Sequence, residues 1–447
     1  MQGATRAVVA LVLALLWTPA LPTAWADGPD QAALIARAYQ YGFPIFEQAR
    51  LVYLYSYFPG NPQRVPVNRF GHRRQLVDHT ARTVTTPNND TLYSSAVIDL
   101  SAGPVRLDVP DFGERYWSIA FIDAFTNNFF YLGTRVSGNK GGSYQIVGPD
   151  WAEKPSDGTI LIRSPGNHIV AIARILIDGP EDYERVHRLQ DALILSAPVP
   201  AKPAPDPERP VPGDPINFVA VVNRVLRDDP PPAADAAILS VLAAVGIGGN
   251  AGPLSEAQRR LWSDGFTHAQ AELLAESRAI GTHIDGWDYM PPDIGDFGTD
   301  YRTRAIVALR GIAANIPAEM SYALAASDRT GAPLDGDRRY RLHLAPATPP
   351  AEGFWSFSIY EVTKDGGLFF GDNPIHRYAI GDRTKGLIRN SDGSFDIVIQ
   401  KESPGRGGEA NWLPIPAKSF VIIARAYLPR AAIVEGTYRY PGIEPMK

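Results

Sequence analysis

The densest group of polar side chains in the sequence is an amide-and-acid run that directly precedes an apolar stretch. Carboxylate, amide and hydroxyl oxygens in such a run can orient a sugar hydroxyl or bind a hard cation such as calcium. Asn and Asp also hydrogen-bond nearby backbone and tolerate left-handed conformations, so a turn that joins two strands is the alternative. We predict a small or oligomeric ligand in a groove beside this run. The predicted ligand-binding residues are Asn88, Asn89, Asp90, Thr91, Tyr93 and Asn127.

Two carboxylates are candidates for general acid–base catalysis. Asp90 and Asp123 would act as acid and base in a hydrolase or lyase, with or without a bound cation. In the alternative interpretation the charges are structural, and Asp123 forms an ion pair with Arg174. The same arrangement then recurs later in the chain, where Glu361 pairs with Arg425. We favour the ion pairs, because each arginine ends an apolar strand and buried charges are rarely unpaired. Whether the protein is an enzyme stays open.

Several common chemistries lack their motifs. The eight histidines include no His-x-x-x-His or His-Glu-x-x-His, so the usual helical spacing of zinc ligands is missing. The chain has no cysteine, which excludes a thiol nucleophile, thiolate metal sites and iron–sulfur clusters. The glycine-rich segment 246–252 lacks the Lys-Ser/Thr of a phosphate loop. His72 and His79 flank two arginines and could reach a ligand's carboxylate, with a solvated loop as the alternative. We predict no metal site and identify no cofactor.

The elements that position these residues change along the chain. Two short helices are expected at the start, the second opening at Pro44. From Thr83 onward, brief alternating runs such as Val105–Val109 are separated by Gly, Pro, Asn and Asp, which is typical of short strands. Residues 196–214 are Pro-rich and predict an extended connector. Ser255 begins a capping-box pattern for a helix, and the apolar residues within 305–316 predict another.

The two β-rich parts resemble each other. Gly142–Val147 matches Gly393–Val398, and Val170–Arg174 matches Val421–Arg425, at the same offset of 251 residues. Self-similarity in fixed order indicates a repeated structural unit. We predict a mainly β fold with helical segments, in which two β-sandwich or jelly-roll-like modules, at about residues 83–178 and 325–430, are an internal duplication joined by a helical middle region.

The first 26 residues have the pattern of a secretory signal. Arg6 is followed by the apolar run Ala7–Trp17 and by a small-x-small site at Ala24-Trp25-Ala26. We expect the mature chain to begin at Asp27 and the protein to be exported to the periplasm. A net charge of -5 gives no electrostatic handle on nucleic acid, and no later stretch is apolar enough to span a membrane. A structural or assembly role, with exposed aromatic residues as contacts in a homo-oligomer, is a third hypothesis.

Longer motifs resemble two known families. The segments similar to the family called domain of unknown function 1254 are Thr86–Tyr93, Asp99-Leu100, Gly103-Pro104 and Arg115-Tyr116. The segments similar to domain of unknown function 1214 are Phe354–Ser356, Asp392–Ser394, Asn411–Pro414 and Arg425–Pro429. The resemblance implies a two-domain, β-rich, mostly bacterial and often exported protein with no generally established activity or catalytic residues. We therefore expect a leader at 1–26, a first domain with its leading helices at 27–195, a connector and helical segment at 196–324, and a second domain at 325–447.

Overall fold

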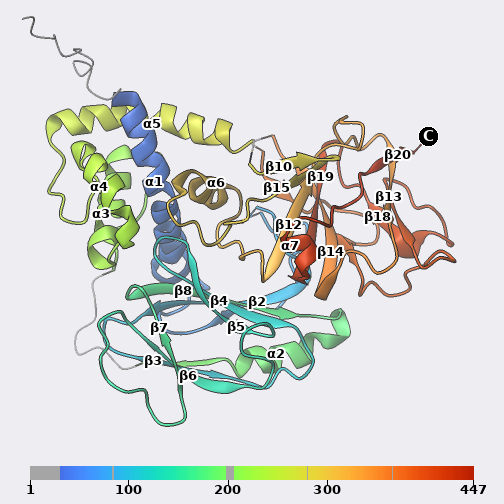
Figure 1. The fold of residues 1–447 in the computed structure, drawn as a ribbon, viewed down its shortest axis with the longest axis horizontal. Coiled ribbons are helices and arrows are strands. Elements are labelled where there is room, and N and C mark those ends of the chain that lie inside the picture. The colour runs from blue at the N-terminus through green and yellow to red at the C-terminus, as the bar shows by residue number, and fades with distance from the viewer. Residues whose placement is uncertain (1–30, 83–84, 198–205, 279, 365, 447) are drawn as a thin grey trace, which may run out of the picture.

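The computed structural model describes residues 31–82, 85–197, 206–278, 280–364 and 366–446. In these ranges the chain forms a group of helices and two β-sandwiches, and helices and sheets together give a mixed α/β fold with four β-sheets (Figure 1). The predicted leader, its cleavage site and part of the predicted connector lie outside the described residues.

The helical part is built around α1 (Gln31–Val52), which continues as a π-helical turn, Tyr53–Tyr57. We predicted two helices divided at Pro44, but Pro44 lies inside a single helix. The helix passes through this proline because residues 41–46 are all buried, and tertiary packing outweighs local propensity. The surrounding helices are α3 (Pro215–Asp228), α4 (Ala236–Leu242), α5 (Glu256–Glu276) and α6 (Tyr301–Gly311). Short 3₁₀ turns precede and follow α4, at Ala233–Asp235 and Ala243–Val245.

Local signals explain the helix ends. The predicted capping box at Ser255 is present, with Gln258 as its partner. Asp214 caps α3 by accepting hydrogen bonds from two backbone N–H groups of its first turn. Helix α6 ends at Gly311, although the apolar pattern that predicted it extends to residue 316, and the chain then turns through Ala313 in a left-handed conformation with φ 65°. This early end directs residues 313–316 onto the neighbouring sheet, where they pack against apolar side chains.

The first β-module comprises the strands between residues 71 and 196. Its larger sheet has the order β1 (Gly71–His72), β2 (Thr91–Asp99), β8 (His168–Leu176), β4 (Trp117–Ile122), β5 (Asn128–Gly133). Its smaller sheet has the order β7 (Ile160–Arg163), β6 (Gly142–Val147), β3 (Val105–Val109), β9 (Ile194–Ser196). A 3₁₀ turn, Pro180–Asp182, and helix α2 (Tyr183–Asp191) precede β9. The two sheets share one apolar core, so the module is a sandwich.

The second β-module comprises the strands between residues 282 and 446. Its larger sheet has the order β10 (Thr282–Ile284), β11 (Trp287–Tyr289), β12 (Met320–Ala325), β19 (Phe420–Pro429), β14 (Ala351–Val362), β15 (Leu368–Phe369), with β16 (Ala379–Gly381) also paired to β14. Its smaller sheet has the order β18 (Trp412–Pro414), β17 (Phe395–Gln400), β13 (Arg339–Leu344), β20 (Glu444–Met446). A 3₁₀ turn, Glu409–Asn411, precedes β18, and helix α7 (Ala431–Val434) follows β19. This sheet begins before residue 325, where we expected the second domain to start.

The predicted duplication is confirmed by the strand pairing. In each module a central strand, β8 or β19, lies between β2 or β12 on one side and β4 or β14 on the other. In each smaller sheet one pair is parallel, β6 with β7 and β17 with β18. The residues at equivalent positions are Tyr93, Arg174, Ser118 and Gly133 in the first module and Tyr322, Arg425, Ser356 and Gly381 in the second.

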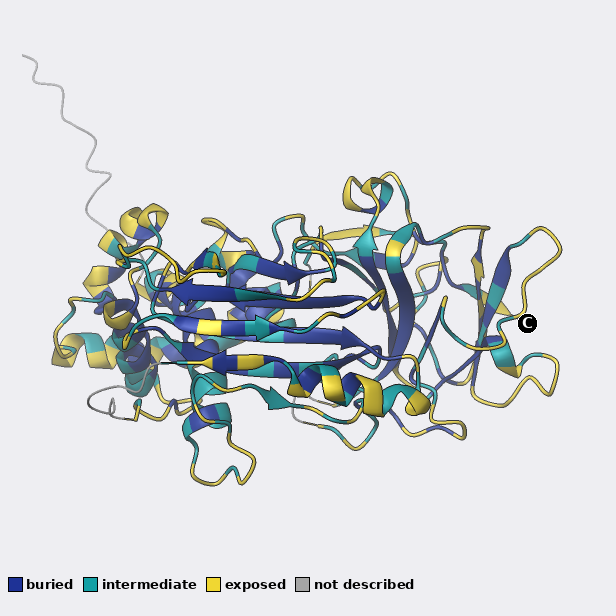
Figure 2. Ribbon diagram, turned by 90° about the horizontal axis from the view of Figure 1, so that it is seen from below, coloured by how far each residue is buried: buried dark blue, intermediate teal, exposed yellow. Residues whose placement is uncertain are grey.

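The central strands alternate between two buried environments. In β8, residues such as Ala171 and Ala173 face the sandwich core, while Ile172 and Arg174 lie on the outer face of the sheet. Strand β19 has Arg425 on its equivalent outer face. Figure 2 shows that the strands of the sheets are largely buried and that exposed residues gather on loops and helices. The outer faces of the larger sheets are therefore largely covered by other parts of the same chain, whereas alternate residues of smaller-sheet strands such as β13 are exposed. Among the described helices, none has the length and apolar character needed to span a bilayer.

Candidate functional site between the two β-modules

The predicted ligand-binding run lies where the two modules meet. The amide oxygen of Asn88 accepts hydrogen bonds from the backbone N–H groups of Asp90 and Thr91, and its amide nitrogen donates to the Tyr427 hydroxyl. The Asp90 carboxylate accepts a hydrogen bond of 2.7 Å from the Ser356 hydroxyl. Asn88, Asp90 and Thr91 are all buried. We predicted that this run lines an open groove; instead it is a buried contact, because the second module covers it.

The remaining members of the predicted site have different surroundings. Asn89 is half-buried and donates its amide N–H to the backbone oxygen of Val77. Tyr93 is also half-buried and lies on the outer face of the larger sheet, beside Arg174. Asn127 donates to the carboxylate of Asp123 over 3.1 Å. The structure therefore brings Tyr93 close to the contact between the modules and leaves Asn127 with Asp123.

The proposed acid–base pair is wrong. Thr91, next to Asp90, pairs with Leu176 at one end of β8, and Ile122, next to Asp123, pairs with Val170 at the other end. Six residues of extended strand separate these ends by about 20 Å, whereas carboxylate pairs cooperate at about 5 to 9.5 Å. The two carboxylates therefore do not converge on one ligand.

Asp123 instead closes a tight turn after β4. Its carboxylate accepts hydrogen bonds of 2.9 Å from the backbone N–H groups of Phe125 and Asn127. Burial raises the pKa of Asp123 from 3.8 to about 6, against the opposing effect of these hydrogen bonds. The carboxylate therefore serves the local turn.

The predicted ion pairs are also wrong, because the strand register places each acid away from its arginine. Arg174 pairs across the sheet with Ser118, which lies five residues before Asp123 in β4. Glu361 is likewise displaced from Arg425 along β14, since Arg425 pairs with Ser356. Five residues of strand separate acid from base by about 16 Å in each module.

Both arginines are buried and have other partners. Arg425 donates to the Ser358 hydroxyl over 3.0 Å and to the backbone oxygen of Thr86 over 3.2 Å. Glu361 forms an ion pair with Arg82. Burial alone would lower the pKa of Arg425, but Tyr360, Tyr427 and Asp90 together hold it above its usual value. Arg425 therefore has a carboxylate among its neighbours.

Arg174 differs from Arg425 in its charge environment. Its guanidinium donates to the Asn315 side-chain oxygen over 3.1 Å and to the backbone oxygen of Ala313 over 3.0 Å. Burial would lower the pKa of Arg174, and Tyr93, Tyr322 and neighbouring tyrosines hold it above its usual value. Within the part of the chain that the structure describes, Arg174 forms no ion pair with a carboxylate.

Two hydrogen-bond donors beside Arg174 have no partner. They are the Nε of Arg174 itself and the amide nitrogen of Asn315, both unpaired within the described residues. Arg174 is 5% exposed and Asn315 is fully buried. Buried polar groups are nearly always hydrogen-bonded, so these two donors are available to an acceptor supplied by water or by a ligand. The partial exposure of Tyr93, Ala313 and Tyr322 connects this group to solvent.

The surface also has shallow recesses away from this centre. One of about 370 Å³ beside the first module is lined by Arg69, Phe70, His72 and residues 193–197. Burial, with a contribution from Arg74, lowers the pKa of His72 from 6.5 to about 4. Its ring accepts or donates a hydrogen bond of 2.8 Å with the Ser94 hydroxyl. His72 is therefore a packed, neutral side chain at the edge of this recess.

A third group was missed in the sequence. His79, Asp372 and His376 place three potential metal-ligand atoms within 4.8 Å of one another. Asp372 and His376 lie four residues apart in a loop, whereas the zinc motifs with this spacing place two histidines on a helix. His79 comes from the other β-rich part of the chain, so only the fold could bring it to them.

Comparisons with known proteins agree with this organisation and confirm the resemblance seen in the motifs. The family described as protein of unknown function DUF1254 matches residues 67–197, and the one described as protein of unknown function DUF1214 matches residues 319–431. A search of curated proteins finds no match.

Two solved structures are similar to this chain. The VPA0106 protein from Vibrio parahaemolyticus is 26% identical with a TM-score of 0.70, and the match covers 94% of this chain and 100% of that one. A putative uncharacterized protein from Burkholderia cenocepacia is 12% identical with a TM-score of 0.45, and the match covers 93% of each chain.

Proposed function

Because the chain belongs to the proteins that combine DUF1254 with DUF1214, domains of unknown function, we propose a function from its own geometry: it binds a small organic anion between the two β-modules. The ligand's carboxylate, or a similar anionic group, accepts hydrogen bonds from the Nε of Arg174 and the amide nitrogen of Asn315. Tyr93 contributes an aromatic face and a hydroxyl at the partly exposed edge. As in the prediction from the sequence, the ligand lies beside the first module, but Arg174 and Asn315 bind it in place of the polar run at 88–91.

The observation that carries the proposal is the buried positive charge of Arg174. A buried ion costs several kcal/mol unless it is paired and hydrogen-bonded. A guanidinium binds a carboxylate in a planar, two-pronged geometry, which makes arginine suited to recognise such a group. An anionic ligand would supply both the missing charge and the missing acceptor.

The internal duplication strengthens this argument. Arg425 has the equivalent strand position and equivalent burial, but Asp90 lies near it and its nitrogens have partners in the structure. The charge of Arg425 is therefore balanced by an acid of the first module. Around Arg174, Tyr93 and Tyr131 of the first module and Tyr322 of the second take the place of an acid. The ligand is assigned to the first module on this difference.

The proposal is tested by thermal unfolding with a panel of small carboxylates: acetate, succinate, citrate, benzoate and gluconate. A ligand at a hundred times its dissociation constant stabilises the folded state by about 2.7 kcal/mol. We expect at least one probe to raise the unfolding temperature of the wild-type chain. The Arg174→Gln variant should lose this shift, because glutamine cannot supply a charged donor.

Arg425→Gln is the matched control. It should lower the stability without ligand, because it leaves Asp90 without its positive neighbour, yet keep the ligand-induced shift. If no probe stabilises the wild type, or if Arg174→Gln responds as strongly as the wild type, the assignment is wrong. Isothermal titration with the active probe then gives the stoichiometry, expected to be one per chain.

The place of action is the periplasm, and residues 1–26 direct export. The support is the order of Arg6, the apolar run Ala7–Trp17 and the small residues around Ala26. Sequencing the amino terminus of the protein from a cell envelope fraction should find Asp27. Recovery of chains that retain Met1 in the cytoplasm would contradict this.

A further inference from the structure

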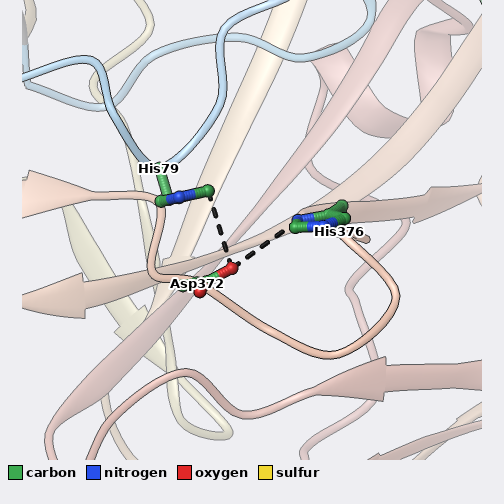
Figure 3. Close-up of side chains that lie close together, drawn as sticks. All are labelled: His79, Asp372 and His376. Atoms are coloured by element: carbon green, nitrogen blue, oxygen red, sulfur yellow. Dashed lines mark ion pairs between the residues drawn. The ribbon is translucent and has the colours of Figure 1, made fainter.

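Two histidines and an aspartate meet at the boundary between the modules (Figure 3). The carboxylate of Asp372 lies 3.7 Å from the Nδ1 of His79 and 3.6 Å from the Nδ1 of His376. The two imidazole rings are stacked, with centroids 5.9 Å apart. The carboxylate is thus central, and both rings lie beside it.

The loop that carries Asp372 and His376 is held in shape by its own hydrogen bonds. The side-chain oxygen of Asn373 accepts from the backbone N–H of Arg377 over 2.9 Å, and its nitrogen donates to the backbone oxygen of Arg377 over 3.1 Å. His376 has a left-handed backbone conformation with φ 47°, which is uncommon for a residue with a side chain. Arg377 in turn donates to the backbone oxygen of Trp412 over 2.8 Å. The loop therefore presents both side chains in a fixed relation.

His79 is positioned by a different set of contacts. Its Nδ1 lies 2.7 Å from the hydroxyl of Tyr378, which limits rotation of the ring. The adjoining Val77 is buried against Phe370, Tyr378 and other apolar side chains of the second module. The Nδ1 of His79 is also the ring nitrogen that lies 3.7 Å from the Asp372 carboxylate, so a metal ion bound there takes the place of the hydrogen bond to Tyr378.

From this arrangement we infer that His79, Asp372 and His376 bind a divalent transition-metal ion, with zinc as the first candidate. Two imidazole nitrogens and one carboxylate oxygen are ligands that zinc accepts. Ligand atoms around a tetrahedral zinc ion with bonds of about 2.0 Å lie about 3.3 Å apart. The observed separations of 3.6 and 3.7 Å need only small side-chain movements to reach this geometry.

Access and location add to the inference. The side chains of Asp372 and His376 are each 69% exposed, so an ion reaches them without any opening of the fold. Three protein ligands leave a fourth position for water or for a ligand atom. His79 belongs to the segment matched by DUF1254, and the other two belong to the segment matched by DUF1214. A bound ion therefore links the two modules directly.

The test is isothermal titration of ZnCl₂ into the full chain, treated with a chelator and purified without a histidine tag. We expect one zinc ion per chain. Loss of a hydrogen-bond partner of a metal ligand typically weakens binding 10–100-fold, so loss of the ligand His376 in His376→Ala should weaken it by about a hundredfold. Zinc should also raise the unfolding temperature of the wild type.

Two further variants make the result decisive. His283→Ala is the matched control, because His283 is an exposed histidine paired with Asp288 at 2.7 Å; it should bind zinc as the wild type does. His79→Gln should weaken binding as much as His376→Ala, since both are ligands. Absence of stoichiometric zinc binding, equal affinity in His376→Ala and His283→Ala, or full binding by His79→Gln would each overturn the inference. Circular dichroism confirms that every variant is folded.

Discussion

Glu319 offers a direct test of how the modules hold together. It precedes β12 as Asp90 precedes β2, and its backbone oxygen accepts from Leu428 as that of Asp90 accepts from Ile177. The carboxylate of Glu319 is 1% exposed. It accepts a hydrogen bond of 2.8 Å from the Tyr116 hydroxyl in the first module.

The same carboxylate forms an ion pair of 2.7 Å with Arg135, whose side chain is 30% exposed. For unit charges about 4 Å apart at an effective dielectric constant of about 20, Coulomb's law gives about 4 kcal/mol. Solvent around Arg135 screens part of this attraction, and glutamine retains a hydrogen-bond acceptor. We therefore expect Glu319→Gln to lower the free energy of unfolding by about 2 kcal/mol.

Urea denaturation of four chains measures this effect: the wild type, Glu319→Gln, Arg135→Met and the double variant. The coupling energy between the two positions should be about 1 to 2 kcal/mol and should fall as salt is added. Glu352→Gln is the control, since that side chain is 70% exposed and lies 4.0 Å from Arg430; a change within about 0.5 kcal/mol is expected. A coupling energy near zero would refute the reasoning, because the ion pair would then contribute nothing across the interface.

Three further changes have expected outcomes. Burial raises the pKa of Asp123 from 3.8 to about 6, so the folded state favours the protonated carboxyl. The protein should therefore lose about 3 kcal/mol of stability as pH rises from 3.8 to about 6. Urea denaturation at pH 4 and pH 7 should show this loss in the wild type and not in Asp123→Asn. Burial lowers the pKa of His72 from 6.5 to about 4, so the folded state favours the neutral ring. The stability that this preference contributes is lost as pH falls from 6.5 to about 4. In thermal unfolding, His72→Gln should therefore be destabilised less by acid than the wild type. Gly42→Ala should destabilise the folded protein by about 1 kcal/mol, because the new Cβ would lie 2.9 Å from the buried ring of Phe218. This outweighs the higher helix propensity of alanine. A higher unfolding temperature for the variant would contradict the prediction.

The sequence contained enough information to predict the duplication. Gly142–Val147 forms β6, and Gly393–Val398 overlaps β17, which begins at Phe395. Among the described residues, each of these strands belongs to the only parallel pair of its smaller sheet. The two modules share the order of their central strands, because equivalent patterns of alternating apolar residues bury equivalent faces of the sheets. The equivalence of β2 and β12 could not be predicted, since Tyr93 and Tyr322 are 229 residues apart and the later landmarks are 251 apart. Loops of different length hid the equivalence of β2 and β12.

The candidate site was less predictable, because the partners of each side chain depend on how strands pair and how the two modules pack together. Asp123 and Arg174 recur at matching places in the sequence, yet antiparallel register puts them at different heights on the sheet. Asn88 and Asp90 have the composition of a binding loop, but Tyr427 and Ser356 come from a distant part of the chain to cover them. A polar run indicates where hydrogen bonds are needed and does not identify their partners.

The surroundings of Arg174 and Arg425 differ between the two copies of the duplicated module. Each lies at the same position of a central strand, and each is a buried positive charge that is costly unless it is balanced. In the second module Asp90, contributed by the first, lies near Arg425. The reciprocal acid is Glu319, but Arg135 and Tyr116 occupy its oxygens. Arg174 is therefore left with tyrosines and an amide, and this asymmetry directs the search for a ligand to the first module.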